Sequence, residues 1–362
     1  MRILQVGVTL PEVGGAERHI YELCKRLSEK MEVILLTQKA SRPKGFLPKV
    51  KIVEVPVIRK NVYLRNLSFS IFSIIPLIKV ILKEKPDLIH IHYGVFQSIL
   101  GLLSRIFGKK IVYTVHGFSG WRMSKKIIRN LVTLILNHSY KVVCVSPAVV
   151  EDLGKFGVKK RKMVYIPNGI NFKDFKIKHR KVKKNITFFG RLHKQKGVEY
   201  LILAFKKIYK SHRDFKLIII GDGPDRKRLE EMCGDIANRV IFTGYVDRKK
   251  LIRYLMESCM IVLPSLYEGF PLALLEAMCS GRPVITTNIK PIRSVVKDGV
   301  IFVGVKDVEG LSRRIIKLIK NQRLREFIGR KGREVAKKFD WSFVVDEHIK
   351  LYNLLISKCY DY

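Results

Sequence analysis

The chain has 362 residues, of which 47% are hydrophobic and 28% are charged. This length exceeds what one hydrophobic core usually covers, and the composition excludes a disordered chain, so we expect two globular domains. With 70 Lys and Arg against 31 Asp and Glu, the formal net charge is +39. Such a charge indicates either an anionic partner or simply a Lys-rich proteome.

Short β-branched runs alternate with helical patterns along the chain. In the first half the runs are RILQVGV, EVILLT, KIVEVPV, DLIHIHY, KIVYTVH, KVVCVS and MVYIPNG, and a helix is predicted from Ala16 to Lys30. The second half restarts the pattern with ITFFG, KLIIIGDG, VIFTGYV, MIVLP and PVITT, and with helices at 197–209 and 226–233. Apolar strands separated by helices are typical of parallel sheets covered on both faces. We therefore predict an α/β protein with two doubly wound, Rossmann-like domains.

The domain boundaries follow from the same pattern. We place the first domain at residues 1–172, a polar and aperiodic linker at 173–185, and the second domain at 186–340. The last segment, 341–362, has apolar residues at helical spacing and completes either the second domain or the first. Because doubly wound sheets bind ligands beyond the carboxyl ends of their strands, we expect the site in a cleft between the domains.

Positive charge is concentrated between Val55 and Val150. The only acids there are Glu84 and Asp87, against 14 bases: Arg59, Lys60, Arg65, Lys79, Lys83, Lys85, Arg105, Lys109, Lys110, Arg122, Lys125, Lys126, Arg129 and Lys141. Such a surface attracts nucleic acid or anionic lipid headgroups. The apolar stretch from Leu67 to Leu82 lies in the same segment, and it is short for a bilayer span, so we predict a buried or interfacial helix.

The cysteines and the opening residues indicate the cellular setting. The six cysteines form no C-x-x-C pair, and we expect free, buried thiols in a reducing compartment: Cys24, Cys144, Cys233, Cys259, Cys279 and Cys359. The sequence shows no zinc-like spacing of Cys and His, so we expect no metal site. The opening MRILQVGVTL lacks a small-residue cleavage site and predicts a first strand instead of a secretory signal.

Two motifs of the second domain carry charge into the predicted cleft. Arg191 and Lys196, in FFGRLHKQKG, follow its first strand and suit a departing diphosphate. Glu268 and Glu276, in PSLYEGFPLALLEAM, lie before and within a helix that Pro271 can begin at its first turn. The N-terminus of that helix would attract a phosphate, and the two carboxylates would accept hydrogen bonds from hydroxyl groups.

Three further motifs follow strands and are weaker signals. Gly14 and Gly15 would let backbone N–H groups approach a phosphate, although the pattern is not G-x-G-x-x-G and disfavours a nicotinamide cofactor. His116, in TVHGF, contacts a ligand or is structural, with equal weight on both. Asp222 and Asp225, in GDGPD, are spaced poorly for a metal ion and favour a turn and a helix cap. One ligand would satisfy the charged groups together, namely a nucleotide-diphosphate sugar.

Taken together, these motifs resemble those of the retaining glycosyltransferases of family 4, which have the GT-B fold. The resemblance covers nearly the whole chain and keeps the order of the motifs: GG-A-E, TVHG, VSPAV, IPNGI, GRLHKQKG, GDGP, TGYV and the E-x7-E motif EGFPLALLE. It implies transfer from a nucleotide sugar with retention of anomeric configuration and without a divalent metal. It also implies that the closing helix, which begins at FDW, returns to the first domain.

The resemblance further implies a role for each matching residue on the first domain and the basic loop. Gly14 and Gly15 would present N–H groups to the diphosphate, and His116 would contact the donor sugar. Arg191 and Lys196 would hold the diphosphate and stabilise its departure.

In the E-x7-E motif, Glu268 would bind the donor sugar near the reacting centre and Glu276 would bind the ribose hydroxyls. Val246 would lie against the base, and the phosphate would be lined by Gly269, Phe270, Pro271 and Leu272. Pro271 lacks the N–H that a glycine would supply there. We expect UDP as the nucleoside diphosphate and no cofactor besides the substrate.

The surface of the first domain bears on the acceptor and on the alternative functions. Its basic surface and apolar stretch predict a glycan or lipid-linked acceptor, and a cytoplasmic protein on the inner face of an anionic membrane. The alternative to a membrane contact is that the apolar stretch is a core helix and that the lysines are scattered over the surface. A GT-B epimerase of nucleotide sugars is a second enzyme hypothesis. A nucleic-acid-binding protein is a third and is not expected, since no aromatic and basic RNA motif, zinc finger or recognition helix is found.

Overall fold

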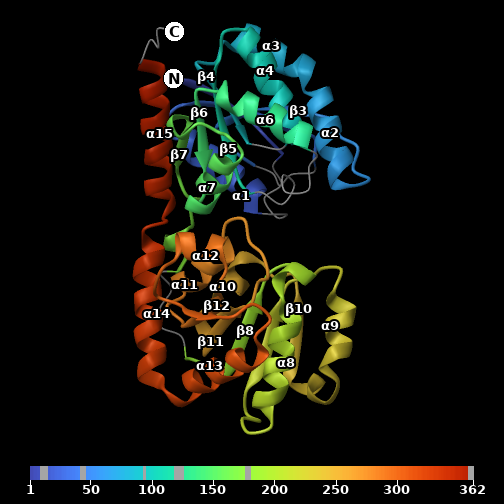
Figure 1. Ribbon diagram of the computed structural model, residues 1–362, viewed down its shortest axis with the longest axis vertical. Helices are drawn as coiled ribbons and strands as arrows, with labels where there is room; N and C mark the ends of the chain where they lie inside the picture. The colour runs from blue at the N-terminus through green and yellow to red at the C-terminus, as the bar shows by residue number, and fades with distance from the viewer. Residues whose placement is uncertain (9–14, 41–45, 93–94, 118–125, 176–180, 358–362) are drawn as a thin grey trace. The chain divides into compact units, whose positions relative to one another are not determined.

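The computed structural model describes residues 1–8, 15–40, 46–92, 95–117, 126–175 and 181–357 (Figure 1). The chain divides into two compact units. The first unit is Met1–Asn168 together with the segment from Ser342 onward, and the second unit is Gly169–Trp341. The boundary in the sequence, between Asn168 and Gly169, lies a few residues before the expected linker. Residues 176–180 of that linker lie outside the described residues.

The first unit contains a seven-stranded sheet in the order β3-β2-β1-β4-β5-β6-β7. All its strand pairs are parallel. The strands are β1 (Arg2–Val6), β2 (Glu32–Gln38), β3 (Val50–Val55), β4 (Leu88–His92), β5 (Lys110–Val115), β6 (Lys141–Cys144) and β7 (Met163–Tyr165). The central strands are buried on both faces, as their continuous apolar runs predict. The strand order reverses between β1 and β4, which is where such sheets bind ligands.

Helices cover both faces of this sheet. They are α1 (Gly15–Leu27), α2 (Val62–Phe72), α3 (Ile74–Glu84), α4 (Ser98–Ile106), α6 (Lys126–Asn137), α7 (Pro147–Lys155) and, from the end of the chain, α15 (Trp341–Ser357). In the first unit α15 is held by polar contacts with the sheet, because Gln5 Nε2 donates to the Tyr352 hydroxyl at 3.2 Å. Lys110 Nζ also donates to the Leu355 carbonyl at 2.8 Å. The closing helix thus packs on the first unit.

The apolar stretch 67–82 forms two helices where the sequence predicted one. α2 ends before Ser73 and α3 begins after it, because Pro76 has no N–H for the carbonyl of Phe72 and its ring crowds that carbonyl. Within the described residues no single helix is long and apolar enough to cross a membrane. The pair Tyr63–Phe72 and Ile74–Glu84 passes that test only together, and it is bent by 43°.

The second unit contains a six-stranded parallel sheet in the order β10-β9-β8-β11-β12-β13. The strands are β8 (Asn185–Phe189), β9 (Lys216–Ile220), β10 (Val240–Gly244), β11 (Met260–Leu263), β12 (Val284–Thr287) and β13 (Ile301–Val303). The order repeats that of the first six strands of the first unit, so the prediction of two doubly wound sheets is confirmed.

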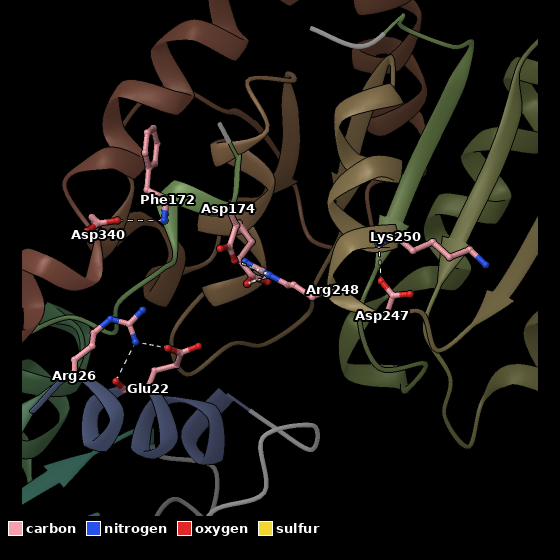
Figure 2. A network of polar contacts seen from close by, with 9 residues as sticks. Glu22, Arg26, Phe172, Asp174, Asp247, Arg248, Lys250 and Asp340 are labelled. Atoms are coloured by element: carbon pink, nitrogen blue, oxygen red, sulfur yellow. Dashed lines mark hydrogen bonds and ion pairs between the residues drawn. The ribbon is translucent and has the colours of Figure 1, made fainter. Parts of the chain in front are cut away.

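The helices of the second unit are α8 (Val198–Tyr209), α9 (Arg226–Cys233), α10 (Arg248–Glu257), α11 (Leu272–Cys279), α12 (Lys290–Val295), α13 (Val308–Lys320) and α14 (Gln322–Lys337). The two ends of this unit are tied together by backbone bonds. Ile170 N–H donates to Phe339 O at 2.8 Å, and Trp341 N–H donates to Ile170 O at 3.1 Å. The Asp340 carboxylate accepts from Phe172 N–H at 3.2 Å (Figure 2). The unit is therefore closed at its own termini.

The cysteines agree with the prediction of free, buried thiols. The five that lie in the described residues are buried and free: Cys24, Cys144, Cys233, Cys259 and Cys279. Cys359 lies outside the described residues.

Candidate functional site

The loop after β8 is fixed to the loop after β9. Leu192 N–H donates to Asp222 O at 2.9 Å, and Asp225 N–H donates to Leu192 O at 3.1 Å. A Cβ atom at Gly221 would lie 2.1 Å from the carbonyl oxygen of Gly190, so only glycine permits this approach. Arg191 is exposed on this rigid loop, and its side chain forms no ion pair or hydrogen bond within the described residues. Its cation is available to a ligand.

The same loop continues as a 3-10 turn, Lys194–Lys196, that packs on the loop after β11. Gly197 has a φ of 62°, and a Cβ atom there would lie 2.3 Å from Pro264 O. Leu266 N–H donates to Gln195 O at 2.8 Å, and Gln195 Nε2 donates to Tyr267 O at 2.9 Å. These bonds bring the basic loop against the segment that precedes α11.

Lys196 and Glu268 meet at this junction. Lys196 Nζ lies 2.7 Å from Glu268 Oε1, and the Ser265 hydroxyl donates to the same oxygen at 2.7 Å. Their side chains are only 22% and 13% exposed. The sequence placed both residues at the site, and the structure joins them in a partly buried pair. A diphosphate that approached Lys196 would meet a cation already positioned by a carboxylate.

Glu276 forms an ion pair that the sequence did not reveal. Arg248 Nη1 lies 2.6 Å from Glu276 Oε1, and Arg248 Nε lies 3.1 Å from Asp174 Oδ2 (Figure 2). The guanidinium also lies over the ring of Phe175, 5.4 Å from its centroid. Burial lowers the pKa of Arg248, but the carboxylates of Glu276 and Asp174 raise it by more, so the pKa is raised overall.

The helix that follows Glu268 begins one residue later than expected. Pro271 immediately precedes α11, whose first residue is Leu272, so the proline lies outside the first turn where the sequence placed it. No side chain caps this helix in the described chain, and its N-terminus can receive an anion. Phe270 and Pro271 are buried, whereas Gly269 and Leu272 are half-buried. A small cavity beside them is lined in part by Lys196, Ser265, Glu268 and Pro271.

Val246 lies half-buried in the loop between β10 and α10, next to the exposed Tyr245. The loop is anchored by Asp247, whose Oδ1 accepts from Lys250 N–H at 2.8 Å and caps α10 (Figure 2). The position that the resemblance assigns to the base therefore lies in an anchored loop. That role stays a prediction.

The GDGPD turn is confirmed, but its helix cap is not. Asp222 Oδ1 accepts from Gly223 N–H at 2.7 Å, and Asp222 Oδ2 pairs with Arg226 at 3.0 Å. Asp225 stands before α9 but makes no side-chain cap bond, because its carboxylate pairs with Arg228 at 3.3 Å instead.

His116 directly follows β5 in the first unit and belongs to a buried group of histidines. Its Nε2 lies 3.3 Å from His92 Nδ1, and the ring centroid of His19 is 4.9 Å away. Burial, with a smaller contribution from His348, lowers the pKa of His116 to about 4, so the imidazole is neutral at pH 7. Gly15 opens α1 and is exposed, whereas Gly14 lies outside the described residues.

The comparisons with known proteins agree with these motifs. Residues 13–174 match the model of glycosyltransferase family 4, and residues 170–335 match that of the glycosyl transferases group 1. The chain is 30% identical over 363 residues to an uncharacterised glycosyltransferase of Methanocaldococcus jannaschii, covering 98% of this chain and 99% of that one.

A second relative and a solved structure are also similar over most of their length. A phosphatidylinositol N-acetylglucosaminyltransferase subunit of Saccharomyces cerevisiae is 25% identical over 372 residues, covering 96% of this chain and 81% of the subunit. The crystal structure of Anabaena HepE in complex with UDP has a TM-score of 0.81 at 17% identity. The match covers 98% of this chain and 100% of that one.

Proposed function

Because the chain belongs to the group 1 glycosyltransferases of family 4, we propose that it transfers a sugar from a UDP-sugar to its acceptor and releases UDP, with retention of anomeric configuration and without a divalent metal. The parallel-sheet units and the likeness to HepE confirm the GT-B fold. Both family models describe glycosyltransferases, which favours transfer over the epimerase and nucleic-acid-binding alternatives. That HepE was crystallised with UDP supports UDP as the nucleoside diphosphate.

The observation that carries the proposal is the Lys196–Glu268 pair beyond the carboxyl ends of β8 and β11. Lys196 and the exposed Arg191 supply two positive charges where a diphosphate would gain negative charge as it leaves. The N-terminus of α11 adds a third favourable interaction from its N–H groups. These groups supply the charge stabilisation that a divalent metal would otherwise provide, and Glu268 stands beside them to hold the sugar.

Calorimetric titration with UDP, GDP and ADP in EDTA tests this donor site. We expect UDP to bind, and we expect Lys196→Ala to weaken binding by about 2 kcal/mol, roughly 30-fold, because a charged hydrogen bond is lost. Lys194→Ala removes an exposed cation from the same turn and is the matched control, with affinity unchanged. Equal weakening by both variants, or no binding by the wild type, would contradict the proposed site.

We further propose that the acceptor is lipid-linked and is met at an anionic membrane. In the first unit α2 packs on α3, α3 on α4 and α4 on α6, which makes a continuous helical layer (Figure 1). This layer, which we call the lipid face, exposes large apolar side chains: Tyr63, Ile71, Phe72, Ile75, Leu82, Ile99, Leu102, Ile106, Ile127, Ile128, Leu131 and Leu134. Ile75, Ile106 and Ile127 are 66%, 78% and 80% exposed, and large apolar side chains exposed on neighbouring helices are typical of an interaction surface.

Basic residues accompany these apolar side chains. Lys79, Lys83 and Lys126 are exposed on the same helices, which suits anionic headgroups around an apolar contact. The name of the yeast relative, a phosphatidylinositol N-acetylglucosaminyltransferase subunit, supports a lipid acceptor. Arg122 and Lys125, also counted in the basic segment, lie outside the described residues.

Co-sedimentation with vesicles tests the lipid face. The protein should sediment with vesicles rich in phosphatidylglycerol and stay in the supernatant with pure phosphatidylcholine. The double variant Ile75→Glu, Ile127→Glu should lose binding, because it places two charges in the apolar contact. Val305→Glu changes an exposed apolar residue of the second unit and should bind as the wild type does. If the wild type did not sediment with anionic vesicles, the proposed membrane contact would be wrong.

A further inference from the structure

A cavity of about 480 Å³ lies at the amino edge of the sheet in the second unit. Its wall includes the residues that directly precede β8, β9, β11 and β12, which are Lys184, Phe215, Cys259 and Pro283. These four strands are neighbours in the sheet. Lys196 and Glu268 follow the other ends of β8 and β11, so the cavity and the proposed donor site lie at opposite edges of the sheet.

Two arginines of the cavity wall are held by backbone carbonyls. Arg325, near the start of α14, donates from Nη1 to Leu318 O at 2.5 Å and to Ile319 O at 3.0 Å. Arg282, before β12, donates from Nε to Met256 O at 2.8 Å. Beyond its two bonds, the side chain of Arg325 forms no hydrogen bond or ion pair within the described residues. A carbonyl fixes a guanidinium without neutralising it, so the charge of Arg325 is available to an anion.

The described lining of the cavity is positively charged. It holds two carboxylates, Asp214 and Glu326, against four permanent cations, Lys183, Lys184, Arg282 and Arg325. Asp214 already pairs with Lys184, and Glu326 Oε1 accepts from Gln322 Nε2 at 2.9 Å.

The two guanidiniums act at one place in the cavity. Burial raises the pKa of the Cys259 thiol, and the cations of Arg325 and Arg282 offset part of that rise. Burial also lowers the pKa of Arg282, because a cation is costly to hold away from water. An anion bound between Arg282 and Arg325 would reduce that cost.

Apolar and aromatic side chains complete the wall. Phe215 and Pro283 are buried, and Ile319 is half-buried. The ring centroids of His212 and Phe215 are 6.4 Å apart, with an interplanar angle of 75°. The cavity volume falls within the range of about 300–1,000 Å³ that is typical of small-molecule sites. An inorganic phosphate would fill only a small part of this space, whereas a flat ring would contact the apolar wall.

We propose that this cavity binds a phosphate monoester with a ring-shaped organic body. Arg282 and Arg325 hold the phosphate, because a guanidinium can donate two parallel hydrogen bonds to phosphate oxygens. The ring lies against Phe215 and Pro283. The site lies wholly within the second unit and does not rest on the donor site. In a chain with 70 Lys and Arg, the sequence gives no reason to single out these two arginines.

Fluorescence titration of the full-length protein with naphthyl phosphate tests the cavity. The wild type should bind one molecule per chain, at least about 10-fold more tightly than it binds naphthol or inorganic phosphate. Arg325→Gln should weaken binding at least about 10-fold, because charged hydrogen bonds are lost. Arg323→Gln removes an exposed cation from the same turn of α14 and should bind as the wild type does. Equal weakening by both variants, or a wild type that binds naphthol as tightly, would overturn the proposal.

Replacing Arg325 can also disturb the junction of α13 and α14, so a measurement on the wild type stands beside the variants. Hydrogen–deuterium exchange with naphthyl phosphate should be slower in peptides that cover 281–285 and 319–326, and unchanged in 190–197. Lys196→Ala should bind naphthyl phosphate as the wild type does, whether or not it binds UDP. Protection at 190–197 alone, or weakening by Lys196→Ala, would place the molecule at the donor site and overturn the proposal.

Discussion

The two units share a strand order but fill the carboxyl edges of their sheets with opposite chemistry. In the second unit that region holds ion pairs, Lys196 with Glu268 and Arg248 with Glu276. In the first unit the edge holds neutral imidazoles, among them His92 and His116. One fold therefore carries a charged edge and an uncharged edge, and the difference lies in a few residues that follow the strands.

This contrast has a physical consequence for ligand binding. A cation already held by a carboxylate is positioned before a diphosphate binds, so less side-chain entropy is lost on binding. Buried imidazoles instead avoid the cost of burying charge by staying neutral. Loss of one charge should thus harm the second unit most, whereas gain of a proton should harm the first unit most.

The largest expected effect is on catalysis in the second unit. Glu268→Gln removes the charge that positions Lys196 and holds the donor sugar, so we expect turnover to fall about 100-fold to 1,000-fold. The rate of UDP release at saturating donor measures the change. Glu231→Gln, on the exposed surface of α9, is the control and should retain full turnover. A Glu268→Gln enzyme with wild-type turnover would remove this residue from the site.

Next in size is the stability of the second unit. Arg248→Met leaves two carboxylates, Glu276 and Asp174, without their shared partner, and breaking a buried pair costs about 3 kcal/mol or more. The corresponding drop in melting temperature is about 6–12 °C for a unit of this size. Scanning calorimetry should show this drop, whereas Arg253→Met, an exposed change on the same helix, should leave the transition in place. Similar melting of both variants would show that the pair contributes no net stability.

A smaller effect is expected from the pH dependence of the first unit, where the buried imidazoles are neutral. Burial lowers the pKa of His348 from 6.5 to about 4, and the unfolded chain takes up this proton first as the pH falls. The stability of the first unit should therefore be complete above about pH 6.5 and decrease between pH 6.5 and 4, by on the order of 3 kcal/mol for this one histidine.

Calorimetry at pH 7.5 and pH 5.0 measures that loss. His348→Leu should reduce the pH dependence of the first-unit transition, because the titrating group is gone. His90, His92, His19 and His116 surround it and should retain the rest of the slope. A first-unit transition that does not change between the two pH values would contradict the neutral cluster.

Part of this picture was predictable from the sequence. Motifs that directly follow strands placed Lys196 and Glu268 correctly near one another, because parallel strands end at a common edge. The Arg248–Glu276 pair was not predictable, since a chain with so many cations gives no reason to select Arg248. The histidine group was also missed, because only the β1-β4-β5 order brings His19, His92 and His116 together. The break at Ser73 was readable from Pro76, although we predicted one helix there.

Hydrogen–deuterium exchange of the intact protein with and without UDP, in EDTA, tests the central claim most directly. We expect slower exchange in peptides that cover 190–197 and 265–276, and little change around His92 and His116. Protection centred on the histidines, with none at the Lys196–Glu268 junction, would contradict it.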